Sequence, residues 1–209
     1  MGAYTLVIGN KNYSSWSLRP WLAMKMAGQS FDEMVIPLGQ QATTAEIARH
    51  SPAGKVPILH HGGTAVWESI AILEYLAELV PEARAVARAV SAEMHSGFAA
   101  LRTHMPMNIR ASKAGRGRTP EVDKDIRRSV AIWEDCRARF GEGGPFLFGR
   151  FSNADAMYAP VVTRFKTYGV ELQGAARAYA EAILALPRMV EWYAAAKAEP
   201  WSMPENDAA

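Results

Sequence analysis

Three short groups of polar residues near the start of the chain could bind or activate a small ligand. The first is a cluster of hydroxyls, Ser14, Ser15 and Ser17, which follows a short apolar run and opens an amphipathic segment. A helix start has free backbone N–H groups and a positive dipole end, and both attract a negative atom. A serine hydroxyl there can donate to an anion, although serine is also a common helix N-cap. From this cluster alone, capping is the simpler interpretation.

The other two groups would hold the ends of a small peptide. Residues 55–57, Lys-Val-Pro, precede a predicted strand. If the Val56–Pro57 bond is cis, the backbone groups of Val56 stay free to pair with an extended peptide ligand, and Lys55 can meet a carboxylate. At Glu68 and Ser69 another helix begins, so Ser69 and the helix N–H groups can hold a carboxylate while Glu68 holds an ammonium. The three groups together fit a small peptide thiol.

Hydrophobic periodicity and turn residues predict the elements that carry these groups. A strand–helix–strand unit of this length has a right-handed crossover, so its two strands should be parallel, whereas the short turn at 60–64 makes the next two strands an antiparallel hairpin. The expected order is βαβαββα around a mixed four-stranded sheet. Its parts are a strand at 4–8, a helix to about Ala27, a strand at 31–38 and a short helix opened by a capping box at 43–46. A third strand is expected at the end of the stretch 54–59, followed by a strand at 65–67 and a helix from 68 that ends at Pro81.

After Glu82 the pattern changes, because long helical periodicities appear and strand signals disappear. A capping box at Ser152 and Asp155 is predicted to open a core helix. The helices are expected at 85–109 (one or two), 121–140, 156–168, 175–186 and 188–198. The change places a domain boundary near residues 81–86, with an α/β domain at 1–82 and an all-α domain at 86–209.

Composition excludes several classes of protein. The 209 residues are 49% hydrophobic and 21% charged, with a formal net charge of +2, which is too small to indicate nucleic-acid binding. No apolar run is long enough to span a membrane and no signal peptide is evident, so we expect a cytoplasmic protein. The single cysteine, Cys136, excludes an internal disulfide and is expected to be a buried, inert thiol. The histidines lack metal-ligand spacing, so we expect no metal.

The motifs together resemble the cytosolic glutathione transferase superfamily over nearly the whole chain. The serine cluster with Arg19 is similar to the S-S-C-x-x-R motif of the zeta class, and the Lys-Val-Pro and Glu-Ser pairs also look like the tau class. The resemblance implies a thioredoxin-like N-terminal domain, an all-helical C-terminal domain and a homodimer. It also implies glutathione as co-substrate and a small electrophile as second substrate. The residues concerned are 14–19, 54–57, 68–76, and Ser152 with Asp155.

The resemblance gives each residue an expected role. Ser14, five residues before Arg19, is the first choice for the hydroxyl that donates to the glutathione thiolate, and Ser15 is the alternative. A hydrogen bond to the charged form and the helix dipole would lower the pKa of that thiol. The expected glutathione-binding residues are Gln41, Lys55, Val56, Pro57, Glu68 and Ser69.

Three other functions remain open at this stage. A zeta-type cis–trans isomerase is disfavoured because Trp16 stands where the zeta motif has cysteine. A non-catalytic binding or scaffold protein of the same fold would need neither Ser14 nor Ser15. A disulfide reductase is disfavoured because no cysteine lies at the start of the first helix. The expected function is therefore a glutathione transferase that joins glutathione to an electrophile.

Overall fold

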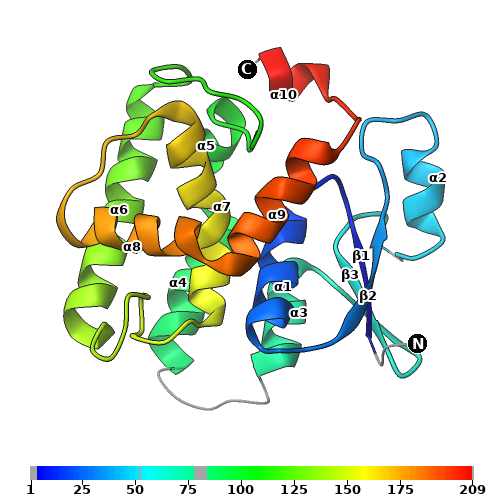
Figure 1. Ribbon diagram of the computed structural model, residues 1–209, viewed down its shortest axis with the longest axis horizontal. Coiled ribbons are helices and arrows are strands. Elements are labelled where there is room, and N and C mark those ends of the chain that lie inside the picture. The colour runs from blue at the N-terminus through cyan, green and yellow to red at the C-terminus, as the bar shows by residue number, and fades with distance from the viewer. Residues whose placement is uncertain (1–3, 52, 78–83, 209) are drawn as a thin grey trace.

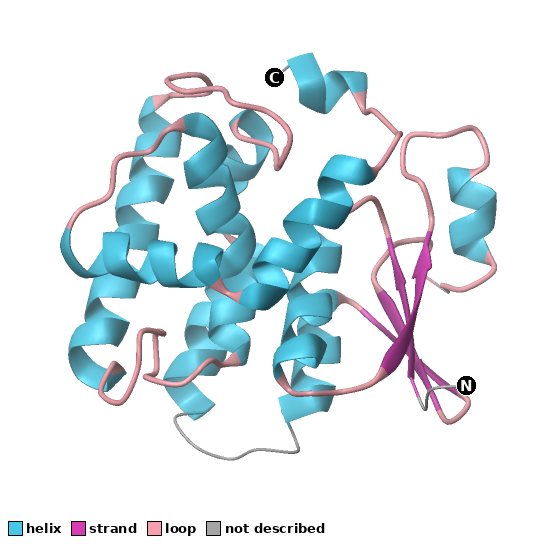
Figure 2. Cartoon of the chain, in the orientation of Figure 1, coloured by secondary structure: helices cyan, strands magenta, loops and turns pink. Residues whose placement is uncertain are grey.

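The computed structural model describes residues 4–51, 53–77 and 84–208. Within these residues the strands form one four-stranded sheet in the order β2-β1-β3-β4, and the second half of the chain forms a bundle of helices (Figures 1 and 2). The expected fold class is confirmed. The first half contains β1 (Tyr4–Ile8), α1 (Ser15–Met26), β2 (Phe31–Val35), α2 (Thr43–Ala48), β3 (Ile58–His61), β4 (Thr64–Trp67) and α3 (Ser69–Ala77). The second half contains α4 (Arg84–Ser96), α5 (Ala99–His104), α6 (Pro120–Phe140), α7 (Asn153–Tyr168), α8 (Gly174–Ala185), α9 (Pro187–Ala198) and α10 (Pro204–Ala208).

The sheet has a different helix layer on each face. β1 is parallel to β2 and antiparallel to β3, and β3 and β4 form the predicted antiparallel hairpin. Because side chains alternate along a strand, Leu6 and Ile8 of β1 join the main core with α1 and α3. Val7 points to the other face and packs with Ile58 and with Ile47 of α2. The N-terminus of α1 is thereby fixed beside the end of β1 (Figure 1).

Two strand limits differ from the prediction. β2 was expected to reach Leu38 but ends at Val35. Pro37 has no N–H for a sheet ladder, and the Leu38 N–H donates instead to Asn10 Oδ1 at 2.5 Å. In the hairpin, His60 and His61 belong to β3, and the turn is confined to Gly62 and Gly63 with φ of 53° and 84°. Glycine adopts such positive φ angles without steric penalty, so the turn needs only these two residues.

The predicted capping box of α2 is wrong. The N-cap is Ala42, and Thr43 is the first residue of the helix. The Thr43 hydroxyl donates to the Pro37 carbonyl at 2.6 Å and accepts from the Gln40 N–H at 2.9 Å, so it closes the preceding loop instead of capping. The expected end of α3 at Pro81, and the first half of the predicted domain boundary, lie outside the described residues. The two domain ranges therefore remain a prediction.

The helical half is organised around α7, which is buried along most of its length. The indole of Trp133 on α6 packs against the rings of Tyr158, Phe165 and Tyr179, with ring centroids 5.0 to 5.9 Å apart. Cys136 is 1% exposed, and burial raises the pKa of its thiol to about 11, in agreement with the predicted inert thiol. Among the described residues, each helix falls short of the length and apolarity that a membrane span requires.

Two helix boundaries in this half were not settled by periodicity. The segment expected as one helix or two is two, α4 and α5, and Phe98 between them has a φ of 57°. α10 was not predicted. It follows a C-terminal segment that is fastened to the β1–α1 turn, since Glu199 accepts hydrogen bonds from the N–H groups of Lys11 at 2.6 Å and Asn12 at 3.1 Å.

The predicted capping box at the start of α7 is present. Asp155 is fully buried, and its Oδ2 accepts from the Ser152 N–H at 2.7 Å and the Ser152 hydroxyl at 2.8 Å. Its Oδ1 accepts from the Leu147 N–H at 3.0 Å, which ties the preceding loop to the helix. Burial raises the pKa of Asp155 to about 6, although these hydrogen bonds act in the opposite direction. The box therefore ties the loop before α7 to the first turn of that helix.

The substitution Asp155→Asn should destabilise the fold in a pH-dependent way. The amide side chain would present an N–H₂ group to donors, which costs about 1–3 kcal/mol. The folded-state pKa near 6 lies above the unfolded value of about 3.9, so the native aspartic acid takes up its proton first as pH falls. The difference in the free energy of unfolding between the wild-type protein and Asp155→Asn should thus be larger near pH 5 than near pH 8 by about 1.4 kcal/mol. Urea unfolding of both proteins at the two pH values measures this. An advantage that shrinks on acidification would mean that the hydrogen bonds outweigh burial.

Candidate functional site

One pocket of about 380 Å³ gathers most of the predicted binding residues. Three segments that are separate in sequence reach it from the sheet half: Trp16 at the start of α1, the loop before β3, and the turn between β4 and α3. The helical half closes it with one residue from α4 and one from α5. The residues that line it are Trp16, Ala53, Lys55, Val56, Pro57, Trp67, Glu68, Ser69, His95 and Arg102.

The β4–α3 turn presents the first polar group. Ser69 is the first residue of α3 and is 1% exposed, and within the described chain its Oγ has no hydrogen-bond partner. Glu68, which is exposed, has a φ of 69° in the left-handed region, uncommon for a residue with a side chain. A buried hydroxyl without a partner at a helix start is a ready donor for an anion. Glu68 beside it adds a negative charge to the same part of the pocket.

The loop before β3 presents backbone groups. The Val56–Pro57 peptide bond is cis, as the sequence interpretation required. Over the described residues, the N–H and C=O of Val56 make no hydrogen bond. The side chain of Lys55 is exposed and lines the pocket, while its N–H donates to Ser51 Oγ at 3.3 Å. This side of the pocket can therefore accept an extended main chain and one negative group.

The serines at the start of α1 are occupied by contacts within the protein. Ser14 is the N-cap, with its Oγ 2.7 Å from Ser17 Oγ and accepting from the Ser17 N–H at 3.3 Å. Ser15 Oγ accepts from Nη2 of Arg164 at 3.2 Å. Both serines are almost fully buried, at 6% and 5% exposure, and neither lines the pocket. The residue of this cluster that does line it is Trp16.

Gln41 is placed apart from the other predicted residues. It lies in the exposed loop between β2 and α2 and does not line the pocket. The structure thus brings together five of the six predicted binding residues, Lys55, Val56, Pro57, Glu68 and Ser69. Ser14 and Ser15 immediately precede Trp16 in the sequence, and Trp16 lines the same pocket as these five residues.

The sequence interpretation missed a group of aromatic and basic residues on the far side of the pocket. The Trp16 ring has the guanidinium carbon of Arg19 4.1 Å and that of Arg102 5.4 Å from its centroid. The imidazole of His95 meets the same ring edge-on at 5.3 Å. Arg19 was part of the recognised motif, but His95 and Arg102 come from the ends of two different helices, so no local pattern marks them.

Positive charge accumulates behind Trp16. Arg19 is completely buried, and this burial, followed by repulsion from Arg164 and Arg102, holds its pKa well below the usual range. Burial and Arg102 lower the pKa of Arg164 to about 10. Burial, and then Arg19, lowers the pKa of His95 too, so its imidazole is neutral at neutral pH. Neither Arg19 nor Arg164 forms a salt bridge with any described residue.

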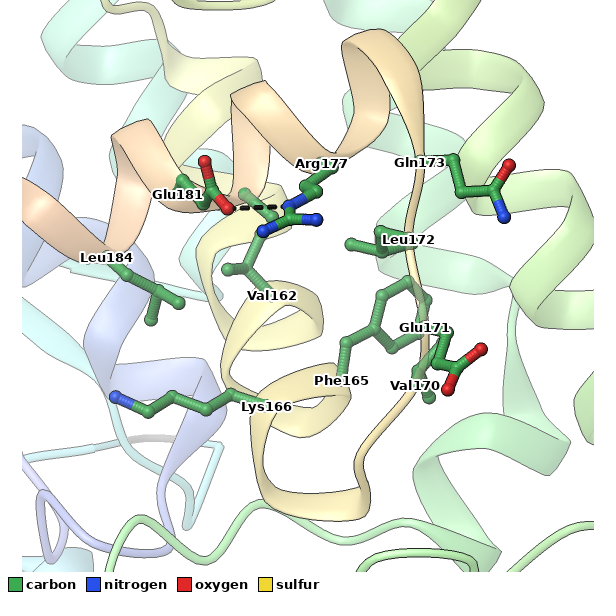
Figure 3. A pocket seen from close by; sticks show the side chains of 11 residues that line it. Val162, Phe165, Lys166, Val170, Glu171, Leu172, Gln173, Arg177, Glu181 and Leu184 are labelled. Carbon is green, nitrogen blue, oxygen red and sulfur yellow. Dashed lines mark hydrogen bonds and ion pairs between the residues drawn. The ribbon is translucent and has the colours of Figure 1, made fainter.

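A larger pocket, of about 520 Å³, lies elsewhere, between α7, the 169–173 loop and α8 (Figure 3). Its apolar walls include Phe165, Leu172 and Leu184, and its charged side chains include Arg177 and Glu181, which pair at 2.8 Å. Its described lining residues include no serine, threonine, tyrosine, histidine or cysteine. Within the described residues, no three His, Cys, Asp or Glu side chains are grouped to hold a metal ion.

Comparison with known proteins gives two family matches. The model of the glutathione S-transferase N-terminal domain matches residues 13–79, and that of the C-terminal domain matches residues 116–195. The sequence has no match among curated proteins.

Solved structures share the fold at low sequence identity. A glutathione transferase homologue from Burkholderia, with bound glutathione, is 21% identical with a TM-score of 0.68, and the match covers 94% of this chain and 99% of the other. A tau-class glutathione S-transferase from mango is 18% identical with a TM-score of 0.68, covering 99% and 96%. A rice glutathione S-transferase in complex with glutathione is 21% identical with a TM-score of 0.64, covering 90% and 91%.

Proposed function

This chain belongs to the glutathione S-transferase superfamily, and we propose that it binds reduced glutathione in the pocket between α1, the β3 loop and α3 and transfers it to a small electrophile. The observation that carries the proposal is the convergence of five predicted binding residues on one pocket. Structures of the same fold from Burkholderia and rice hold glutathione, which supports this assignment.

The polar groups of the pocket match those of glutathione. The γ-glutamyl end carries a carboxylate and an ammonium, which we assign to the free Ser69 hydroxyl with the α3 N-terminus and to Glu68. The cysteinyl main chain would pair with the free N–H and C=O of Val56, as a strand pairs at a sheet edge. The glycine carboxylate would meet Lys55. Each contact uses a group that is exposed or has no hydrogen-bond partner among the described residues.

We assign the thiol to the N-terminus of α1. There the helix dipole favours a thiolate, and a donated hydrogen bond would lower the pKa of the thiol further. Ser14 is our first choice for the donor because it is the N-cap, and donation to the ligand would require it to exchange its contact with Ser17. Ser15 is the alternative, since it accepts from Arg164 and keeps its own proton available. Conjugation would then form a bond between the sulfur and the electrophilic carbon.

A second candidate function is binding of glutathione without catalysis. The observation that favours it is that the hydroxyls of Ser14 and Ser15 both have partners inside the protein. In that case neither hydroxyl would contribute to the reactivity of a bound thiol.

Calorimetric titration with reduced glutathione tests the binding site. Ser69→Ala and Glu68→Gln should each weaken binding by about tenfold or more, because the first removes a hydroxyl donor to the carboxylate and the second removes the negative charge that faces the ammonium. Gln41→Ala is the matched control and should bind as the wild type does, since Gln41 is exposed and outside the pocket. Absence of saturable binding by the wild-type protein at millimolar glutathione would refute the proposal.

Single substitutions of the serines test the thiol assignment. With an aryl halide as electrophile, Ser14→Ala should lower kcat/KM by about 10–100-fold and raise the pKa of the bound thiol, because it removes a donor to the thiolate. The pKa is measured from thiolate absorbance against pH in the glutathione complex. Ser15→Ala should change the melting temperature more than the thiol pKa, because it leaves Arg164 without one partner. The reverse pattern would assign the donor to Ser15. A wild-type protein that binds glutathione, but with neither a lowered thiol pKa nor a rate above that of the uncatalysed reaction, would favour the non-catalytic function.

A further inference from the structure

The helical side of the pocket carries a positive charge that the proposed glutathione contacts leave unused. In that assignment Glu68 meets the ammonium, Ser69 meets one carboxylate and Lys55 the other. Arg102, half-buried at the end of α5, lines the same pocket and is not assigned. Its Nη1 donates to the His95 carbonyl at 2.9 Å, which fixes the guanidinium at the pocket wall and leaves other N–H groups to donate.

The surroundings of Arg102 strengthen this positive charge. The guanidinium groups of Arg19 and Arg102 both lie over the Trp16 ring, and both terminal nitrogens of Arg19 are buried with no partner in the described residues. Of the described residues that line the pocket, Glu68 is the one acid, and the proposed glutathione contacts pair it with the ammonium. Buried positive charges without carboxylates raise the affinity of a neighbouring site for an anion.

His95 completes this wall. Its Nδ1 is buried and unpaired among the described residues, and its ring touches Trp16 edge-on. Because the imidazole is neutral at neutral pH, it offers a hydrogen bond without adding to the charge. An arginine, an imidazole and an indole on one wall suit a planar ligand that carries a carboxylate.

We propose that Trp16, His95 and Arg102 bind the carboxylate end of the second substrate, so that this protein prefers electrophiles that carry a carboxylate to neutral ones. This inference rests on the proposed glutathione site. With an aryl chloride that carries a carboxylate, the glutathione sulfur bonds to the ring carbon that bears chlorine, and the carbon–chlorine bond breaks. Chloride leaves with the bonding electrons, the thiol proton passes to solvent, and the carboxylate remains unchanged as an anchor.

The test compares two electrophiles that differ in one group, 4-chloro-3-nitrobenzoate and 4-chloro-3-nitrobenzamide. Each kcat/KM is divided by the uncatalysed rate constant with glutathione, so that intrinsic reactivity cancels. The wild-type protein should prefer the benzoate. Arg102→Met should lower the benzoate-to-benzamide ratio by about tenfold or more, mainly through the KM of the benzoate, and Arg102→Lys should retain part of it because it keeps the charge but loses the planar fork.

Arg177→Met is the matched control. It removes an exposed arginine that pairs with Glu181 on α8, away from this pocket, and should leave the ratio unchanged. Melting temperatures verify that each variant is folded. If Arg102→Met does not fold, Arg102→Lys and His95→Ala carry the test, and each should lower the ratio.

The remaining outcomes separate this inference from the proposed function. A wild-type protein that binds glutathione but shows no preference for the benzoate overturns the inference alone. An Arg102→Met protein with weaker glutathione binding, or with a raised thiol pKa and equal losses for both electrophiles, would place Arg102 on glutathione and also overturn it. If neither electrophile reacts, titration of the glutathione complex with 3-nitrobenzoate and 3-nitrobenzamide decides, and equal affinities overturn it. No binding of glutathione at all defeats the proposed function itself.

Discussion

Two arginines buried at the seam between α1 and α7 constrain the whole site. Arg19 donates from Nε to the Met157 carbonyl at 3.3 Å, and Arg164 donates from Nε to the Met105 carbonyl at 2.9 Å and from Nη2 to Ser15 Oγ at 3.2 Å. A buried guanidinium is costly unless its donors are satisfied. In the described chain, carbonyls and a hydroxyl accept from Arg164, whereas both terminal nitrogens of Arg19 are buried without a hydrogen-bond partner. The two halves of the protein must therefore meet in one geometry.

That geometry determines which groups face the ligand pocket. The contact of Arg164 with Met105 fixes the C-terminal end of α5, on which Arg102 is carried, and its contact with Ser15 fixes the first turn of α1. Trp16 is thereby turned toward the pocket, where it meets Arg19, Arg102 and His95. The seam that joins the halves and the wall that would receive a second substrate are thus made from the same group of residues.

The sheet half contributes to the pocket by fixing the positions of backbone groups. The β3–β4 hairpin and the packing of α3 bring Val56 and Ser69 to one pocket, each with a polar group that has no hydrogen-bond partner among the described residues. In the turn between β4 and α3, Glu68 has a left-handed backbone conformation. Such conformations are retained where the surrounding structure enforces them, and they are frequent at ligand sites. A ligand with complementary polar groups would form hydrogen bonds with the backbone of Val56 and the hydroxyl of Ser69.

The sequence by itself determined what depends on neighbours along the chain. Alternation and turn residues located β1 and the hairpin, helical periodicity located α1 and α6, and the Glu-Ser and Val-Pro pairs marked two segments that line the pocket, because each is a local signal. Local signals failed at the end of β2 and at the N-cap of α2, where loop hydrogen bonds compete with the regular element. Only the tertiary structure decided that Ser15 meets Arg164, from a helix far along the chain, and that His95 and Arg102 face Trp16. Those contacts depend on how two separately predicted halves pack together, and helix packing angles leave no periodic trace in a sequence.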